Sequence, residues 1–156
     1  MEFNLENKEF PLFLQGPYLR AALTMLPFYA EKTIHIMVPY LIQSQILDSI
    51  LNTPNHVEIK LYTRNRDGYL PNIKIGAQPA MEKLFARENL EMFIDNKIHA
   101  KIWKIDDKFA IVHSMNGTPT SEMSNFEAGV ISIQEQLIKD VQSYFDLVEQ
   151  QATRIK

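Results

Sequence analysis

Segments with the pattern of β-strands alternate with segments with the pattern of α-helices through the N-terminal half of the chain. Residues 33–38 form a nearly continuous run of β-branched and apolar side chains, typical of a strand that is covered on both faces. Residues 44–51 have the spacing of a short amphipathic helix, and residues 57–63 alternate as a second strand does. This order of elements predicts an α/β fold.

The C-terminal half adds a hairpin and a long helix to this pattern. Residues 98–105 and 108–113 are predicted as two strands joined by a tight turn at Asp106 and Asp107. The same periodicities predict helices at 18–31, 79–88 and 134–151, strands at 90–94 and 126–133, and a polar loop at 117–125. We therefore expect a mixed β-sheet flanked by helices on both faces, an α/β/α sandwich, with residues 1–156 forming a single domain.

The composition narrows the functional classes. The 156 residues include no cysteine, which excludes disulfides and cysteine-ligated metal centres. A net charge of −3 argues against a broad electrostatic grip on nucleic acid, although residues 56–108 hold ten Lys and Arg against eight Asp and Glu. The N-terminus is acidic, and prolines and Arg20 interrupt the apolar stretch 10–30. We therefore expect a cytoplasmic protein with neither a secretory signal nor a stable membrane insertion.

A histidine and a lysine stand two positions apart in the first strand of the predicted hairpin. Residues two apart in a strand point to the same face, so His99 and Lys101 should lie side by side. This pair is poorly suited to a hydrophobic core. It is well suited to phosphate chemistry, because an imidazole can act as a nucleophile while an ammonium group neutralises the oxyanion.

Further polar residues follow His99 at defined spacings. Counted from His99, the chain reads His-x-Lys-x4-Asp, with Ser114 at +15, Asn116 at +17 and Glu127 at +28, and Asn125 two residues before Glu127. This pattern resembles the HKD signature of the phospholipase D superfamily, with its trailing Gly-Ser-x-Asn and Asn-x-Glu elements. The resemblance is to the small, nuclease-like members that carry one motif, and it implies the phospholipase D-like α/β/α sandwich.

The resemblance implies a role in catalysis for five of these residues. One His99 would attack phosphorus and form a phosphohistidine intermediate. Lys101 and Asn116 would hold the non-bridging oxygens of the phosphate, with Ser114 assisting, and Glu127 would orient the His99 imidazole. No metal or other cofactor is expected, because paired lysines would supply the positive charge that a divalent ion otherwise brings.

Three other positions receive different roles. Asp106 belongs to the motif, but the resemblance implies a structural role, as turn chemistry at a hairpin also predicts. His113 stands where the family has a glycine, and a side chain there could narrow the phosphate pocket or add a donor to it. We therefore treat His113 and Asn125 as candidate pocket residues.

The family's active site carries two HKD motifs, whereas this chain has one. Small members with one motif pair two identical chains about a two-fold axis, so the resemblance implies a homodimer through the motif face with one composite site. The chemistry gives a reason, because a nucleophilic histidine needs a general acid opposite it, and His99 of a second copy would supply one.

The leading interpretation is a metal-independent phosphodiesterase, a nuclease that hydrolyses DNA or RNA. Two alternatives remain open: a phospholipid or cardiolipin phosphodiesterase, and a non-catalytic phospholipase D-like domain that binds nucleic acid or regulates another protein. The lipid alternative requires an exposed apolar rim near the site, for which Phe93, Met115 and Met123 are the nearby candidates. A complete set of His99, Lys101, Asn116 and Glu127 argues against the non-catalytic alternative, because a binding domain needs no nucleophile.

Overall fold

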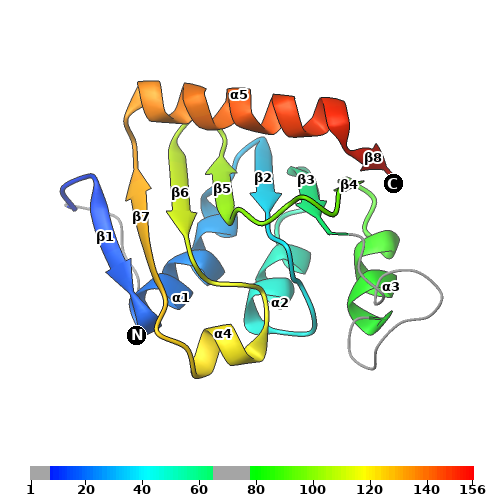
Figure 1. Ribbon diagram of the computed structural model, residues 1–156, viewed down its shortest axis with the longest axis horizontal. Helices are drawn as coiled ribbons and strands as arrows, with labels where there is room; N and C mark the ends of the chain where they lie inside the picture. The colour runs from blue at the N-terminus through cyan, green and yellow to red at the C-terminus, as the bar shows by residue number, and fades with distance from the viewer. Residues whose placement is uncertain (1–7, 65–77) are drawn as a thin grey trace.

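A computed structural model describes residues 8–64 and 78–156 of the chain. Within these residues, eight strands form one sheet in the order β1-β7-β6-β5-β2-β3-β4-β8 (Figure 1). β2 runs parallel to β3 and β3 to β4, while the other neighbours are antiparallel. The strands are β1 (Leu12–Gln15), β2 (Thr33–Met37), β3 (Glu58–Thr63), β4 (Leu90–Ile94), β5 (Ile102–Ile105), β6 (Phe109–His113), β7 (Ala128–Ser132) and β8 (Thr153–Arg154).

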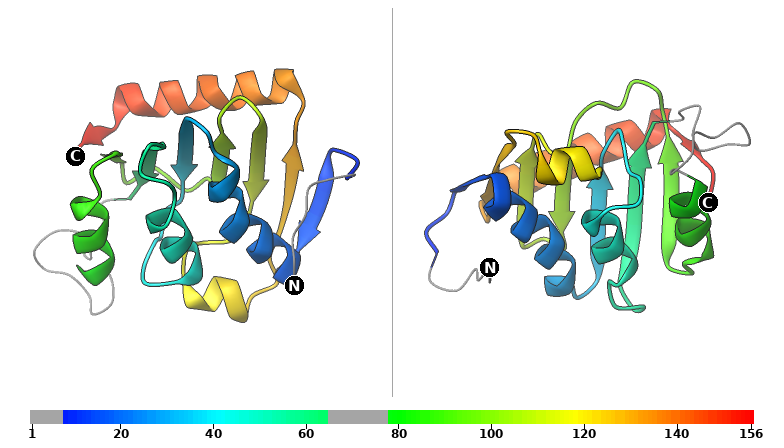
Figure 2. Two further views of the ribbon diagram at one scale, coloured as in Figure 1. Left: turned by 180° about the vertical axis from the view of Figure 1, so that it is seen from behind. Right: turned by 90° about the horizontal axis from the view of Figure 1, so that it is seen from below.

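Helices cover both faces of the sheet, which confirms the predicted α/β class (Figure 2). One face carries α1 (Gly16–Met25), the 3-10 turn η1 (Leu26–Tyr29), α2 (Gln45–Leu51) and α3 (Gln78–Ala86). The opposite face carries the long helix α5 (Glu135–Gln151), and the short helix α4 (Pro119–Met123) lies beside α1. No helix in the described part of the chain is long and apolar enough to cross a membrane.

Three predicted elements need correction. The segment 117–125 is not all loop, because the Thr118 side chain accepts a hydrogen bond from the Ser121 N–H and Pro119 occupies the first turn, which together start α4. The helix predicted at 18–31 gives way to η1 after Met25, at the turn that contains Pro27. The first hairpin strand begins at Ile102, so residues 98–101 precede it.

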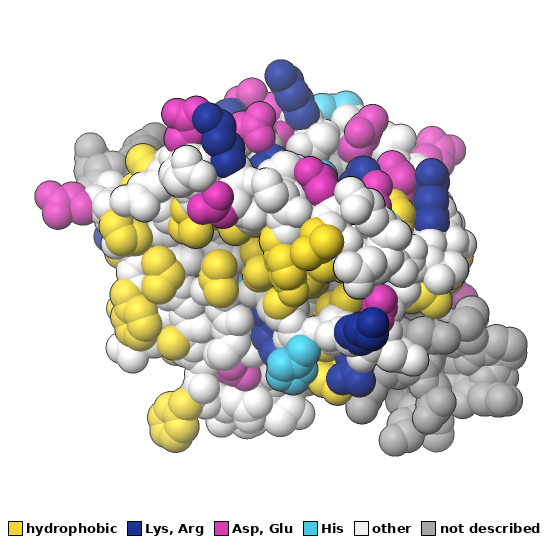
Figure 3. All heavy atoms as spheres, turned by 45° about the horizontal axis from the view of Figure 1, so that its top comes forward, with side chains coloured by type: hydrophobic (Ala, Val, Ile, Leu, Met, Phe, Trp, Pro, Cys, Tyr) yellow, Lys and Arg dark blue, Asp and Glu magenta, His cyan; other side chains and the backbone are white. Residues whose placement is uncertain are grey.

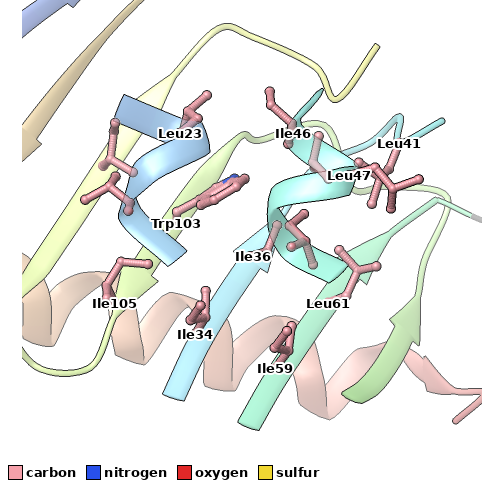
Figure 4. Close-up of a cluster of buried hydrophobic side chains, with 14 of the residues drawn as sticks. Leu23, Ile34, Ile36, Leu41, Ile46, Leu47, Ile59, Leu61, Trp103 and Ile105 are labelled. Atoms are coloured by element: carbon pink, nitrogen blue, oxygen red, sulfur yellow. The ribbon is translucent and has the colours of Figure 1, made fainter. Parts of the chain in front are cut away.

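The larger hydrophobic core fills the space between the sheet and the α1–α2 layer. Figure 4 shows Trp103 from β5 and Ile34 and Ile36 from β2 packed beneath these two helices. Trp103 is 1% exposed, and both isoleucines are fully buried. This core fixes the β5–β6 hairpin, whose ends carry the residues of the HKD pattern, to the parallel half of the sheet.

A smaller core lies under α5 and contains polar groups. The buried His35 of β2 packs edge-on against Phe145 of α5, with ring centroids 5.3 Å apart. The Tyr62 hydroxyl donates to Glu149 at 2.6 Å, and Lys60 forms a 3.0 Å ion pair with the same carboxylate. Burial raises the pKa of Tyr62, and the bond to Glu149 raises it further. α5 is therefore held to the sheet by both apolar packing and a half-buried polar network.

Buried His35 makes the stability of this packing depend on pH. Burial, together with the positive charges of Lys104 and Lys60, lowers the pKa of His35 to about 4. The unfolded chain has the higher pKa and binds the proton first, so the native state loses stability as the pH falls from about 6.5 towards 4. We expect the free energy of unfolding to fall by about 2 kcal/mol from this group between pH 7 and pH 5.

Urea unfolding of the native protein and of His35→Phe at both pH values checks this prediction. The variant keeps an aromatic ring at position 35 and cannot titrate, so its free energy of unfolding should change less with pH than that of the native protein. Equal pH dependence in the two proteins would show that the pKa of His35 is the same in the folded and unfolded chains and would contradict this prediction.

Candidate active site

His99 and Lys101 lie in an extended segment immediately before β5. The His99 side chain is exposed, and Lys101 is half-buried. The Lys101 carbonyl accepts a 3.0 Å hydrogen bond from the His113 N–H, which continues the β5–β6 pairing by one residue. The Lys101 ammonium donates to the His99 carbonyl at 3.2 Å. At this end of the hairpin, the solvent-exposed imidazole of His99 is therefore close in the chain to the ammonium group of Lys101, which is held by a hydrogen bond.

Ser114 and Glu127 meet across the neighbouring strands at the same end of the sheet. Ser114 follows β6, and its N–H donates to the Ala128 carbonyl at 2.9 Å. The Ser114 hydroxyl donates to the buried Glu127 carboxylate and accepts from the Ala128 N–H at 3.1 Å. The Asn125 amide donates to the other Glu127 oxygen at 3.2 Å. Three of the predicted site residues thus form one hydrogen-bonded group around a single carboxylate.

Asn116 is positioned by the glycine that follows it. The Gly117 N–H donates to the Tyr40 carbonyl at 3.0 Å, and the Ile42 N–H donates to the Gly117 carbonyl at 2.9 Å. A Cβ atom at Gly117 would overlap the end of the buried Leu41 side chain, which would have to shift to make room. Among the described residues, no donor reaches the buried Oδ1 of Asn116. The loop is therefore fixed, while the amide oxygen of Asn116 is left without a donor within the described residues.

Asp106 lies at the other end of the hairpin, in the turn between β5 and β6. Its carboxylate accepts hydrogen bonds from the N–H groups of Glu31, Lys32 and Thr33 at 2.9, 2.9 and 2.8 Å. Burial alone would raise the pKa of Asp106, but these three donors outweigh it, and the pKa lies below its usual value. Asp106 thus ties the hairpin to the start of β2 and is separated from His99 by the length of β5.

His113 is buried at the end of β6, on the side of the sheet that carries α1. Its ring lies edge-on to Trp103, with centroids 6.3 Å apart. Burial, reinforced by the charge of Lys101, lowers its pKa to about 3, so the ring is neutral at neutral pH. A Cβ atom at Gly129, the residue opposite on β7, would lie 2.7 Å from the His113 Cβ. Glycine at position 129 therefore makes room for the Cβ of His113.

The predicted hydrogen bond from Glu127 to His99 is not formed within the described chain. The Glu127 carboxylate is occupied by Ser114 and Asn125, and none of its hydrogen bonds goes to His99. The strand arrangement explains the difference: Ser114 leaves β6, the direct neighbour of β7, whereas His99 precedes β5, one strand further away.

Sequence reasoning missed a hollow beside this group. It has a volume of about 510 Å³ and is lined by residues 15–18 and 123–128, which include Asn125 and Glu127. Tyr18, Met123 and Phe126 in this lining are 53%, 66% and 109% exposed. The position of Phe126 between two motif residues was a signal in the sequence, but nothing in the sequence links Tyr18, more than a hundred residues earlier, to the site.

Within residues 8–64 and 78–156, no three His, Asp or Glu side chains are gathered closely enough to hold a metal ion. The charged groups at the site end of the hairpin are instead the Lys101 ammonium and the buried Glu127 carboxylate. This arrangement offers an exposed nucleophile, one cation, and hydroxyl and amide groups that can bind oxygen atoms.

Comparisons with known proteins find the same fold elsewhere. A family model described as "Cardiolipin synthase, PLD-like domain" matches residues 29–148. The solved structure of Nuc from Salmonella typhimurium, a phospholipase D family member, superposes with a TM-score of 0.78 at 17% identity, covering 94% of this chain and 99% of that one. NucT from Helicobacter pylori superposes with a TM-score of 0.72 at 14% identity, covering 91% and 99%. A search of curated proteins finds no match.

Two larger proteins contain the same fold as a part. The archaeal chromatin protein TrmBL2, whose structure shows a mode of DNA binding, matches with a TM-score of 0.68 at 14% identity, over 95% of this chain and 55% of that one. Phosphatidylserine synthase from Haemophilus influenzae matches with a TM-score of 0.69 at 20% identity, over 94% and 39%. Because the family model covers most of the chain, the protein belongs to the phospholipase D superfamily, as a PLD-like domain.

Proposed function

We propose that this protein is a metal-independent phosphodiesterase that cuts DNA or RNA. The observation that carries the proposal is the gathering of His99, Lys101, Ser114 and Glu127 at one end of β5, β6 and β7. There, the exposed His99 and the half-buried Lys101 stand beside the Ser114–Glu127 group. Family membership supports phosphodiester chemistry. Nucleic acid is the substrate that we propose.

The proposed reaction has two steps. A His99 ring nitrogen attacks phosphorus, the P–O bond to the leaving oxygen breaks, and His99 of a second copy gives that oxygen its proton. The same second histidine then takes a proton from water, whose oxygen attacks phosphorus and breaks the P–N bond. Lys101 and the Asn116 amide stabilise the charge on the non-bridging oxygens. Glu127 holds the Ser114 hydroxyl and the Asn125 amide in place beside them.

An exposed apolar row supports the second copy that this mechanism needs. Phe13, Val130, Val112 and Ile102 are direct partners across β1, β7, β6 and β5, so they share one face. Phe13, Val130 and Val112 are 65%, 39% and 45% exposed, and Figure 3 shows a band of hydrophobic side chains across this side of the molecule. The row ends at Ile102, next to Lys101, and would therefore bring two motifs together in a symmetric pair.

Replacing Val112 with glutamate should separate the two copies. A carboxylate in the middle of an apolar interface would lose its hydration when the two copies associate. The free energy gained by burying so small an apolar patch cannot offset this loss. We expect sedimentation to show a dimer for the native protein and a monomer for Val112→Glu, with at least a roughly tenfold loss of phosphodiesterase activity. Phe85→Glu is the matched control, because Phe85 is 40% exposed on α3, away from this row. An active monomeric variant would contradict the composite site.

The substrate is tested by one comparative assay in the presence of EDTA. The native protein is incubated with single-stranded DNA, double-stranded DNA, RNA, and vesicles that contain cardiolipin. Cleavage of a nucleic acid without metal is the expected result. A requirement for Mg²⁺, or release of phosphatidate alone, would overturn the proposal, and binding of DNA without any turnover would favour the non-catalytic alternative.

One observation favours the lipid alternative, namely that the matching family model carries the name of cardiolipin synthase. The apolar rim predicted from the sequence is formed only in part. Of its three candidate residues, Phe93 and Met115 are buried, and Met123 is exposed. We therefore keep nucleic acid as the proposed substrate.

A further inference from the structure

The hollow beside Glu127 combines exposed aromatic rings with the edge of the candidate site. Tyr18 comes from the first turn of α1, and Phe126 from the segment that joins α4 to β7. Asn125 and Glu127, on either side of Phe126, belong to the Ser114 group described above. A group bound in the hollow would therefore lie directly next to a phosphate held at the site.

The apolar side chains that line this hollow are unusually exposed to solvent. The Phe126 side chain is fully exposed, and Tyr18 and Met123 are each more than half exposed, although the chain buries most of its other large apolar residues. Exposed apolar side chains that gather at one hollow mark a binding site more often than isolated ones do. Their backbone is well held, because the Gly16 N–H donates to the Glu127 carbonyl at 2.8 Å and joins the two lining segments.

The chemistry of the lining selects a flat, uncharged and partly polar group. None of the residues that line the hollow is Lys, Arg or His, so it offers no cation for a second phosphate. The guanidinium of Arg20, which is outside the lining, donates to the Glu122 carbonyl at 3.2 Å and contacts the Met123 sulfur. The polar side chains of Gln15, Ser124 and Asn125 would be poorly matched to an acyl chain. A nucleobase has an aromatic face for the rings and polar edges for these side chains.

We propose that Tyr18 and Phe126 form a stacking subsite for one base of single-stranded DNA or RNA, beside the phosphate that is cut. In a duplex, each base face is covered by its neighbours, so only an unstacked base can use these rings. The subsite rests on the proposed function for the position of the phosphate, and it adds a preference for single strands to that function.

The test measures binding separately from cleavage. The His99→Ala protein is titrated with a fluorescent single-stranded oligonucleotide. The titration is repeated with two double variants, which combine His99→Ala with Phe126→Ala or with Tyr18→Ala. Loss of one stacking ring should weaken binding roughly 5- to 100-fold, and Phe126→Trp should restore it. Because no charge is removed, the dependence of binding on salt concentration should stay the same. Phe28→Ala is the matched control, since Phe28 is 51% exposed on η1, outside the hollow.

An oligonucleotide of abasic sites provides the decisive comparison, because it keeps the phosphates and removes the bases. The effect of Phe126→Ala should disappear on this ligand, and it should be small on double-stranded DNA. Equal losses on abasic and normal strands, no loss on either, or a loss of binding to lipid vesicles instead would overturn the subsite. If the native protein cleaves nucleic acid while Phe126→Ala binds normally, the subsite fails and the proposed function stands. If binding depends on the bases but no cleavage is found, the subsite stands and the proposed function fails.

Discussion

The His99→Ala protein is expected to lose phosphodiester hydrolysis by roughly 10⁴-fold or more, because the substitution removes both the nucleophile and the general acid of the proposed site. His99 is exposed, so the folded chain should keep its stability. The measurement is the initial rate of cleavage in EDTA, together with the thermal unfolding of the same sample.

His56→Ala is the matched control for this variant. His56 is also exposed, but it precedes β3 at the end of the sheet opposite to Lys101. Its replacement should leave the rate within about twofold of the native value, as is usual for a surface change away from a site. Cleavage that survives in His99→Ala would show that another residue carries the chemistry.

The Asp106→Ala protein is expected to lose about 3 to 5 kcal/mol of folding stability, because three backbone N–H groups would lose a shared, charged acceptor. Asp106→Asn should lose less than Asp106→Ala, because one side-chain oxygen can still accept from Lys32 and Thr33. Urea unfolding at pH 7 measures both values.

Glu88→Ala serves as the control, since this exposed acid has no hydrogen bond or ion pair within the described residues. Its stability should stay within about 0.5 kcal/mol of the native protein. If Asp106→Ala folds with native stability and loses activity instead, Asp106 acts in the chemistry and the structural role assigned to it is wrong.

The fold could be predicted where the periodicity of side chains extends over a whole element. β4 was predicted with its observed bounds, and α5 within one residue, because apolar positions recur along both with a clear period. β1 was missed because its four residues belong to a longer apolar stretch, and only pairing with β7, more than a hundred residues later, makes them a strand. α4 was missed because its five residues depend on capping by Thr118.

The candidate site could be predicted as a set of residues but not as a set of contacts. The spacing of His99, Lys101, Ser114 and Glu127 indicated that they act together, and the strand register brings Ser114 and Glu127 into contact. The donors that reach the carboxylate depend on the order of the strands in the sheet. The spacing of residues along the chain does not determine that order. For that reason the contacts of Glu127 with Ser114 and Asn125 were not predicted, and Tyr18 was not recognised.

The central claim is that one site needs His99 from two copies of the chain. Native protein and His99→Ala protein are unfolded together, refolded in mixtures of varied proportion, and assayed for cleavage in EDTA. If each site contains both histidines, mixed dimers are inactive, and activity follows the square of the native fraction, about one quarter at an equal mixture. A linear dependence, with about one half of the activity at an equal mixture, would show that each chain carries a complete site and would contradict the composite mechanism.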